Sequence, residues 1–175
     1  MLRLRPYKAQ DARYVADWIC GPVEFSKWCA NRLEYPLTEK GLQELQTRIE
    51  NDEKAWLFTA LEPQGVPVGF FMMRKADYTS NSVHLGFIVI NPRHRGKGYG
   101  KEMLVLALRY AFDILGMDRI TLRAFGNNEA ARRCYKGLGF VDEGCDRDFE
   151  FAPGQWWECY SMVLTHERWR SSQAD

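Results

Sequence analysis

Glycines and cations gather in residues 93–101, which have the sequence RHRGKGYGK. This stretch follows the apolar run 83–90 and precedes residues 101–115, whose apolar positions recur at helical spacing. A strand, a glycine loop and a helix in this order direct backbone N–H groups and the positive end of a helix dipole at a phosphate. The stretch therefore predicts a site for a phosphorylated cofactor.

The glycine spacing excludes two common phosphate loops. Gly96 and Gly100 are too close together for the P-loop pattern, and no hydroxyl residue follows Lys101. The third glycine also comes one position too early for the dinucleotide fingerprint G-x-G-x-x-G. What remains is R-x-x-G-x-G, from Arg93 to Gly98. The cations of this stretch, which suit a ligand with several phosphates, include Arg93, Arg95, Lys97 and Lys101.

A second group of residues lies downstream, in the pattern N-x-x-A-x-x-x-Y-x-x-x-G-F. Asn128 is the expected N-cap of a short helix that ends at Gly137 or Gly139. Ala131 and Tyr135 are one helical turn apart and therefore share a face. A small residue one turn before a phenol leaves room for a ligand along the helix, with the hydroxyl at its end.

With both motifs, the chain resembles the GNAT superfamily of acetyl-CoA-dependent N-acetyltransferases. The family's acetyl-CoA loop, Q/R-x-x-G-x-G/A, is matched by Arg93, Gly96 and Gly98. Its second motif is matched by Asn128, Tyr135, Gly139 and Phe140. The opening residues 2–11 look most like those of the ribosomal-protein alanine acetyltransferase branch.

The resemblance implies acetyl-CoA as cosubstrate and no metal. In the family the pantetheine arm enters a gap between two splayed parallel strands, here Phe87–Ile90 and Leu122–Phe125. The thioester would lie near Ile88–Ile90, and the pyrophosphate on the amides of Arg95–Gly100. The expected cofactor-binding residues are Ile88, Val89, Ile90, Arg93, Arg95, Gly96, Lys97, Gly98, Tyr99, Gly100, Lys101, Asn128 and Tyr135.

Acetyl transfer to nitrogen sets three chemical requirements. An alkylammonium with a pKa of ~10.4 must lose a proton before it attacks the thioester. A backbone N–H, expected to be that of Val89, would stabilise the oxyanion. An acid would then protonate the departing thiolate. The resemblance assigns that role to Tyr135, and the alternative is an ordinary tyrosine packed at the end of a helix.

The general base is the more open assignment. Many family members carry a glutamate on the strand before the glycine loop, where this chain has His84. A histidine pKa of ~6.5 suits a base at neutral pH. The alternatives are a hydrogen-bonded core histidine with solvent as the base, or a carboxylate such as Glu24. Cys134 is interpreted as a packed thiol and not as a nucleophile.

Composition favours one soluble enzyme domain over residues 1–175. The chain is 46% hydrophobic with a formal net charge of +1, which indicates no broad attraction to nucleic acid or an anionic membrane. No apolar run approaches the ~20 residues of a membrane span. The five cysteines form no C-x-x-C pair, which argues against a disulfide framework and a zinc site. We expect a cytoplasmic, reduced protein.

The expected fold class is α/β, of the α+β type. The resemblance implies a single-domain GNAT fold, with a mixed, mostly antiparallel sheet of about seven strands, helices on both faces and splayed central parallel strands. Strands are expected at 2–6, 56–61, 68–74, 83–90, 119–125, 140–151 and 156–164, and helices at 9–19, 38–51, 101–115 and from 128. Residues 21–36 are expected to be irregular, and strand 83–90 to be buried on both faces.

The predicted function is acetyl transfer by direct attack in a ternary complex. A protein or peptide N-terminal amine is the favoured acceptor, with a polyamine or aminoglycoside as the alternative. A non-catalytic CoA sensor and a nucleotide-binding protein are the competing classes. Trp156 and Trp157 alternate across a strand, so one of them could cover the acceptor pocket or contact a second subunit. A homodimer is therefore also expected.

Overall fold

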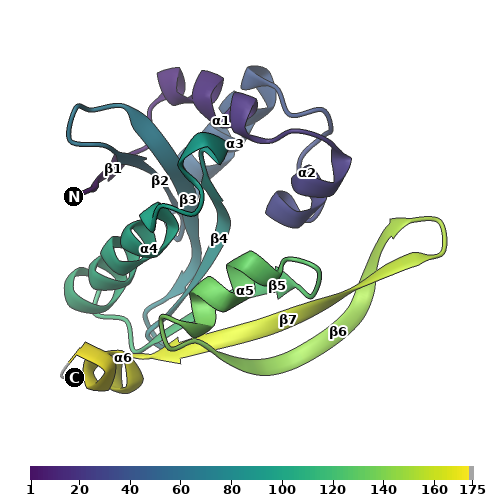
Figure 1. Cartoon of the computed structure of the whole chain (residues 1–175). Coiled ribbons are helices and arrows are strands. Elements are labelled where there is room, and N and C mark those ends of the chain that lie inside the picture. Colours follow the sequence, from purple (N-terminus) through teal and green to yellow (C-terminus); the bar gives the residue numbers. More distant parts are fainter. Residues whose placement is uncertain (174–175) are drawn as a thin grey trace.

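The computed structural model describes residues 1–173. Seven strands form one sheet in the order β1-β2-β3-β4-β5-β7-β6, and only β4 and β5 are parallel neighbours (Figure 1). This confirms the predicted mixed sheet. The strands are β1 Arg3–Pro6, β2 Trp56–Leu61, β3 Pro67–Asp77, β4 Ser82–Ile90, β5 Arg119–Phe125, β6 Val141–Ala152 and β7 Gln155–Thr165.

Helices cover both faces of the sheet, as predicted. They are α1 Ala12–Trp18, α2 Pro22–Cys29, α3 Glu39–Glu50, α4 Tyr99–Arg109, α5 Glu129–Lys136 and α6 His166–Gln173, with a π-helical turn at Tyr110–Ile114. Among the described helices, none combines the length and apolarity needed to cross a bilayer.

Alternate residues of β3 divide the interior into two cores. Phe71 and Met73 pack in the core beneath α4, whereas Phe70 and Met72 pack in the core beneath α1–α3. Successive strand residues point to opposite faces. The strand is therefore almost continuously buried because it is covered on both sides.

A β-bulge in β4 exchanges the faces of its residues. Phe70 pairs with Val89 and Met72 with Gly86, so β4 carries one extra residue there. Before the bulge Leu85 lies in the α4 core, and after it Phe87 and Val89 lie in the α1–α3 core.

The bulge is built around Phe87, whose φ is +53°, and the Trp28 indole N–H donates to its carbonyl at 2.8 Å. The expectation that β4 is buried on both faces was wrong. Buried and half-buried residues alternate along it, and His84, Gly86, Ile88 and Ile90 are the half-buried ones.

The prediction of an irregular segment at 21–36 was also wrong, because it contains α2. Gly21, with φ +82°, precedes Pro22, whose fixed φ suits the first turn of a helix. Phe25 and Trp28 are three residues apart on the buried face. Trp157 packs on Phe151, with ring centroids 4.4 Å apart, while 49% of Trp156 is exposed.

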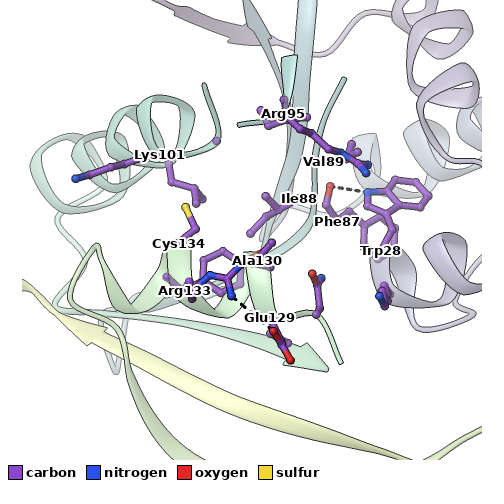
Figure 2. Close-up of a pocket in the computed structure, with 18 of the residues that line it drawn as sticks. Trp28, Phe87, Ile88, Val89, Arg95, Lys101, Glu129, Ala130, Arg133 and Cys134 are labelled. Atoms are coloured by element: carbon purple, nitrogen blue, oxygen red, sulfur yellow. Dashed lines mark hydrogen bonds and ion pairs between the residues drawn. The ribbon is translucent and has the colours of Figure 1, made fainter. Parts of the chain in front are cut away.

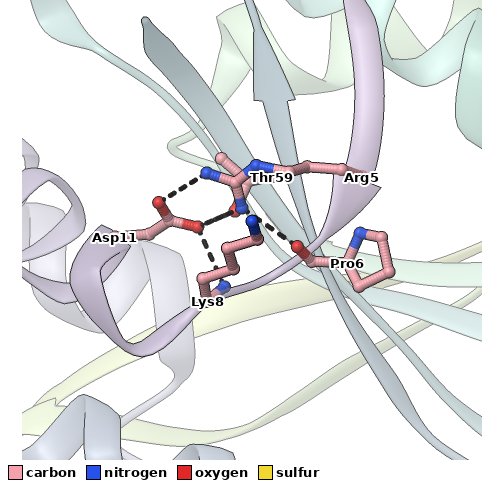
Figure 3. Close-up of polar contacts among 5 residues, drawn as sticks. All are labelled: Arg5, Pro6, Lys8, Asp11 and Thr59. Atoms are coloured by element: carbon pink, nitrogen blue, oxygen red, sulfur yellow. Dashed lines mark hydrogen bonds and ion pairs between the residues drawn. The ribbon is translucent and has the colours of Figure 1, made fainter. Parts of the chain in front are cut away.

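A buried ion pair fixes the start of the chain (Figure 3). Asp11 is 1% exposed and accepts hydrogen bonds from both Arg5 Nη atoms, at 2.7 and 2.8 Å. The Lys8 amide and the Thr59 hydroxyl donate to the same carboxylate. Burial alone would raise the pKa of Asp11, but these hydrogen bonds outweigh it and hold the pKa below its ordinary value.

Candidate active site

A large cavity of about 700 Å³ lies where β4 and β5 separate. The two strands pair only over Ser82–Leu85 and Arg119–Leu122 and splay beyond these residues. The cavity walls come from the second half of β4, the glycine loop, α5 and α2 (Figure 2). The splayed parallel strands implied by the family resemblance are therefore present.

Most of the predicted cofactor residues meet in this cavity. Its lining includes Ile88, Val89, Ile90, Arg95, Gly96, Gly98, Gly100, Lys101, Asn128 and Tyr135. The lining does not include Arg93, Lys97 or Tyr99. Tyr99 instead donates from its phenol to Glu62 Oε1 at 3.0 Å and stacks on His94, so it holds the start of α4 against the end of β2.

The glycine loop has the geometry of an anion site. Gly98 is the N-cap of α4 with φ +83°, and no side chain caps this helix. The first amides of a helix have no partner within it, and the helix dipole makes this end positive. Arg95 and Lys101 line the same part of the cavity and can pair with phosphate oxygens.

Helix α5, with the residues before it, forms the opposite wall. Asn128 is at the N-cap position, as predicted, but its side chain does not accept a hydrogen bond from the helix and lines the cavity instead. Ala131 and Tyr135 both line the cavity, as the shared helix face requires. Cys134 is half-buried beside them, and burial raises the pKa of its thiol, which keeps it neutral.

Tyr135 has the protonation state that an acid needs. It is 7% exposed, and its ring packs edge-on against Phe140. Burial raises the pKa of its phenol. The hydroxyl therefore keeps its proton at neutral pH and can give it to a thiolate.

His84 lies outside this cavity, because before the bulge the even-numbered residues of β4 face α2. Its ring lines a second cavity of about 220 Å³, and Nδ1 is 3.0 Å from the Thr121 hydroxyl. Burial first, and then the charges of Arg74 and Lys75, lower the pKa of His84 to about 3. The ring is therefore neutral and weakly basic, which does not favour the predicted role as general base.

Glu24 is the better placed carboxylate. It lines the large cavity, where its Oε2 is 3.4 Å from Arg95 Nη1, and 43% of its side chain is exposed. Solvent therefore reaches this carboxylate.

The predicted oxyanion donor needs a correction. The Asn91 amide donates to the Val68 carbonyl at 2.8 Å. Along an antiparallel pair of strands, residues whose amides face the partner strand alternate with residues whose amides point away from it. The Val89 amide is therefore directed at Phe70 of β3, and the Ile90 amide points away from β3.

Sequence reasoning placed Phe87 at the gap but missed other residues that line both cavities. Lys27, Trp28, Gly86, Phe87 and Arg123 line both of them. The missed signal was α2, since a helix there brings Lys27 and Trp28 to the gap between β4 and β5. Among residues 1–173, no three His, Cys, Asp or Glu side chains gather as metal ligands would.

Comparisons with known proteins agree with this architecture. The family described as "Acetyltransferase (GNAT) domain" matches residues 1–141. The spermidine N(1)-acetyltransferase of Vibrio cholerae is 27% identical over 168 residues, which cover 96% of this chain and 95% of that protein. The SPbeta prophage-derived N-acetyltransferase YokL of Bacillus subtilis is 27% identical over 136 residues, 77% of this chain and 75% of that one.

A solved structure shares the whole fold. The spermidine N-acetyltransferase from Vibrio cholerae, in complex with CoA and spermine, has a TM-score of 0.84 at 25% identity and covers 97% of this chain and 98% of its own. This chain therefore shares the fold of an acetyltransferase whose structure was solved with CoA bound. The chain belongs to the GNAT acetyltransferase family and is an acetyl-CoA-dependent N-acetyltransferase.

Proposed function

We propose that this enzyme acetylates the primary amine of a small molecule in a ternary complex with acetyl-CoA. The observation that carries the proposal is a pair of cavities that share lining residues at the gap between β4 and β5. The donor occupies the large cavity, and the acceptor reaches the thioester from the smaller one, whose volume of about 220 Å³ suits a small molecule.

The relatives favour a small-molecule acceptor over the peptide N-terminus that the sequence suggested. Two relatives that match almost the full chain are named for spermidine. Spermidine and spermine are therefore the first acceptors to assay.

The residues divide the chemistry as follows. Glu24 or solvent takes a proton from the ammonium group, and the free amine nitrogen attacks the thioester carbon. A backbone amide of β4 stabilises the oxyanion. The new C–N bond remains when the C–S bond breaks, and Tyr135 gives its proton to the thiolate. The phenolate regains a proton from solvent or from the product nitrogen.

The phosphates are assigned to the start of α4. The amides of residues 98–101, with Arg95 and Lys101, hold the pyrophosphate. Arg93 and Lys97 do not line the cavity, and their contacts with the phosphates stay a prediction.

A thiol-release assay tests the proposal. Polyamines, amino acids, aminoglycosides and short peptides are offered at fixed acetyl-CoA, and product is confirmed by mass. We expect turnover with at least one small amine and only background hydrolysis with peptides. Turnover confined to peptides would contradict the small-molecule assignment, and CoA binding without any turnover would favour the sensor.

A further inference from the structure

The smaller cavity is lined mainly by positive charges, which a site for a polyamine would not have. Four cationic side chains line it, together with one carboxylate and the neutral His84 ring. The cations are Lys27, Arg32, Arg74 and Arg123, and the carboxylate is Asp148. We propose that this cavity binds a carboxylate or phosphate group of the acceptor amine. This inference rests on the proposed function, whose substrate class it names.

The cations are poorly compensated within the protein. Arg123 pairs with Asp146 at 3.1 Å and approaches Asp148 at 3.7 Å. Throughout residues 1–173, no carboxylate comes within ion-pair distance of Arg32 or Arg74. Arg74 is half-buried without a carboxylate partner, so an entering anion would find unused donors on its guanidinium.

Arg74 is the central residue of this site. Its Nε is buried and has no hydrogen-bond partner among the described residues. Burial first, and then the charges of Arg32 and Arg123, lower the pKa of its guanidinium, as expected when like charges gather. A planar guanidinium can bind a carboxylate or phosphate through two parallel N–H donors.

Gly86 keeps space open beside Arg74. A Cβ at this position would lie 3.7 Å from Arg74 Nε and 3.9 Å from the His84 ring, in ordinary van der Waals contact. Alanine would therefore fill part of the site without a clash. Because Gly86 and Phe87 line both cavities, an acceptor held here by its anion can present its amine at the gap.

The inference separates this enzyme from the relatives named for polyamines. A polycation would have to enter among three arginines and a lysine, and like charges repel each other. An amine that carries one acidic group has the complementary charge. The small volume of the cavity also fits a single carboxylate or phosphate with a short stem.

Matched amine pairs test the charge preference. Butylamine is compared with 4-aminobutyrate, ethanolamine with phosphoethanolamine, and spermidine serves as the cationic reference. We expect kcat/KM to be at least ~10-fold higher for the acidic member of at least one pair, since hydrogen bonds to charged groups are strong. The pair that shows the gain distinguishes carboxylate from phosphate. A preference for spermidine, or for the member without an acidic group in both pairs, would overturn the proposal.

Two variants assign the preference to this cavity. Arg74→Gln should raise KM for the acidic amine at least ~10-fold while kcat stays similar, because the lost contact is made in both ground and transition states. Gly86→Ala keeps every charge but narrows the site, and should also raise KM. Arg109→Gln, on the exposed side of α4, is the control. Equal KM values in all three variants would overturn the proposal.

A binding measurement keeps this inference separate from the proposed function. Protein saturated with CoA is titrated with inorganic phosphate and with acetate, followed by the shift in Tm. Stabilisation by either anion in the Arg109→Gln control, absent in Arg74→Gln, would support the anion site even if no amine were acetylated. Absence of both anion binding and any acidic-amine preference would refute the anion site, even if other amines were acetylated.

Discussion

Tyr135 lines the cavity, and burial keeps its phenol protonated. We predict that Tyr135→Phe lowers kcat by ~10²-fold or more, because the thiolate loses its proton donor. Affinity for acetyl-CoA should change little, since the ring remains. Steady-state kinetics and calorimetric titration measure the two quantities. Near-normal kcat would remove Tyr135 from the mechanism.

His84 does not change its charge near neutral pH, as an ordinary histidine would. With a pKa lowered to about 3, the ring carries no charge at any pH from about 6 to 9, where the enzyme would be assayed. We predict that the pH profile of kcat/KM is unchanged in His84→Ala over this range.

Glu24→Gln is the comparison for that experiment. A profile whose acidic limb disappears in Glu24→Gln and persists in His84→Ala would identify the carboxylate as the base. The opposite pattern would restore the histidine.

The buried carboxylate of Asp11 accepts hydrogen bonds from Arg5, Lys8 and Thr59. Removing one partner of a buried pair leaves the other uncompensated, so we predict that Asp11→Asn lowers the free energy of unfolding by about 3–5 kcal/mol. Because the folded pKa is lowered, this stabilisation is complete above the unfolded pKa of ~3.9 and is lost as pH falls below it.

Urea unfolding at neutral and acidic pH measures this effect. Glu44→Gln, which breaks only the exposed pair with Lys40, should cost less than about 0.5 kcal/mol and is the control. Similar losses in the two variants would contradict the account of Asp11.

The turn into α4 depends on left-handed glycine, and a second turn offers a matched control. Gly98 has φ +83° and Gly65, between β2 and β3, has φ +88°, and neither would place a Cβ within 4 Å of another atom. Alanine at either position costs about 1–2 kcal/mol of backbone strain.

We predict that both variants lose similar stability, but that only Gly98→Ala also weakens acetyl-CoA binding, because the strain shifts the amides at the start of α4. Thermal unfolding and calorimetric titration distinguish the two effects. Equal affinity in the two variants would place the pyrophosphate elsewhere.

Elements that rest on local pattern were predictable. Strands β2, β4, β5 and β7, the helix α3 and both cofactor motifs follow from spacing along the chain. The bulge in β4 was not predictable, because it arises from how this strand pairs with β3. Helix α2 was missed because its Gly-Pro start resembled a turn.

The smaller cavity was beyond sequence reasoning for a related reason. Arg32, Arg74 and Arg123 come from a loop and two strands that are far apart along the chain. Each looks like an ordinary surface cation until the sheet brings the three together.

Across the whole molecule, cofactor binding should be visible as stability. A ligand that binds only the native state adds about 2.7 kcal/mol at 100 times its Kd. We predict that acetyl-CoA and CoA raise Tm and that ATP, at equal concentration, raises it less, because only the CoA compounds also fill the gap between β4 and β5. Differential scanning fluorimetry measures this, and equal shifts would favour a general nucleotide site.

The assembly stays a prediction. Figure 1 shows the β6–β7 hairpin reaching beyond the rest of the sheet, and most of β6 is exposed. A dodecameric structure of the Vibrio cholerae spermidine N-acetyltransferase has a TM-score of 0.77 with this chain. Light scattering would determine whether this chain forms the expected homodimer.

The main-chain pairing between β4 and β5 ends early, at Leu85 and Leu122. Four residue pairs between β4 and β5 join the first part of the sheet, β1–β4, to the second part, β5–β7. Beyond these pairs, the unpaired edges of β4 and β5 face each other across the gap. An extended chain of amides, such as pantetheine, can add to such edges as an extra strand does. The cosubstrate would thereby connect β4 to β5 beyond the point where their own hydrogen bonding ends.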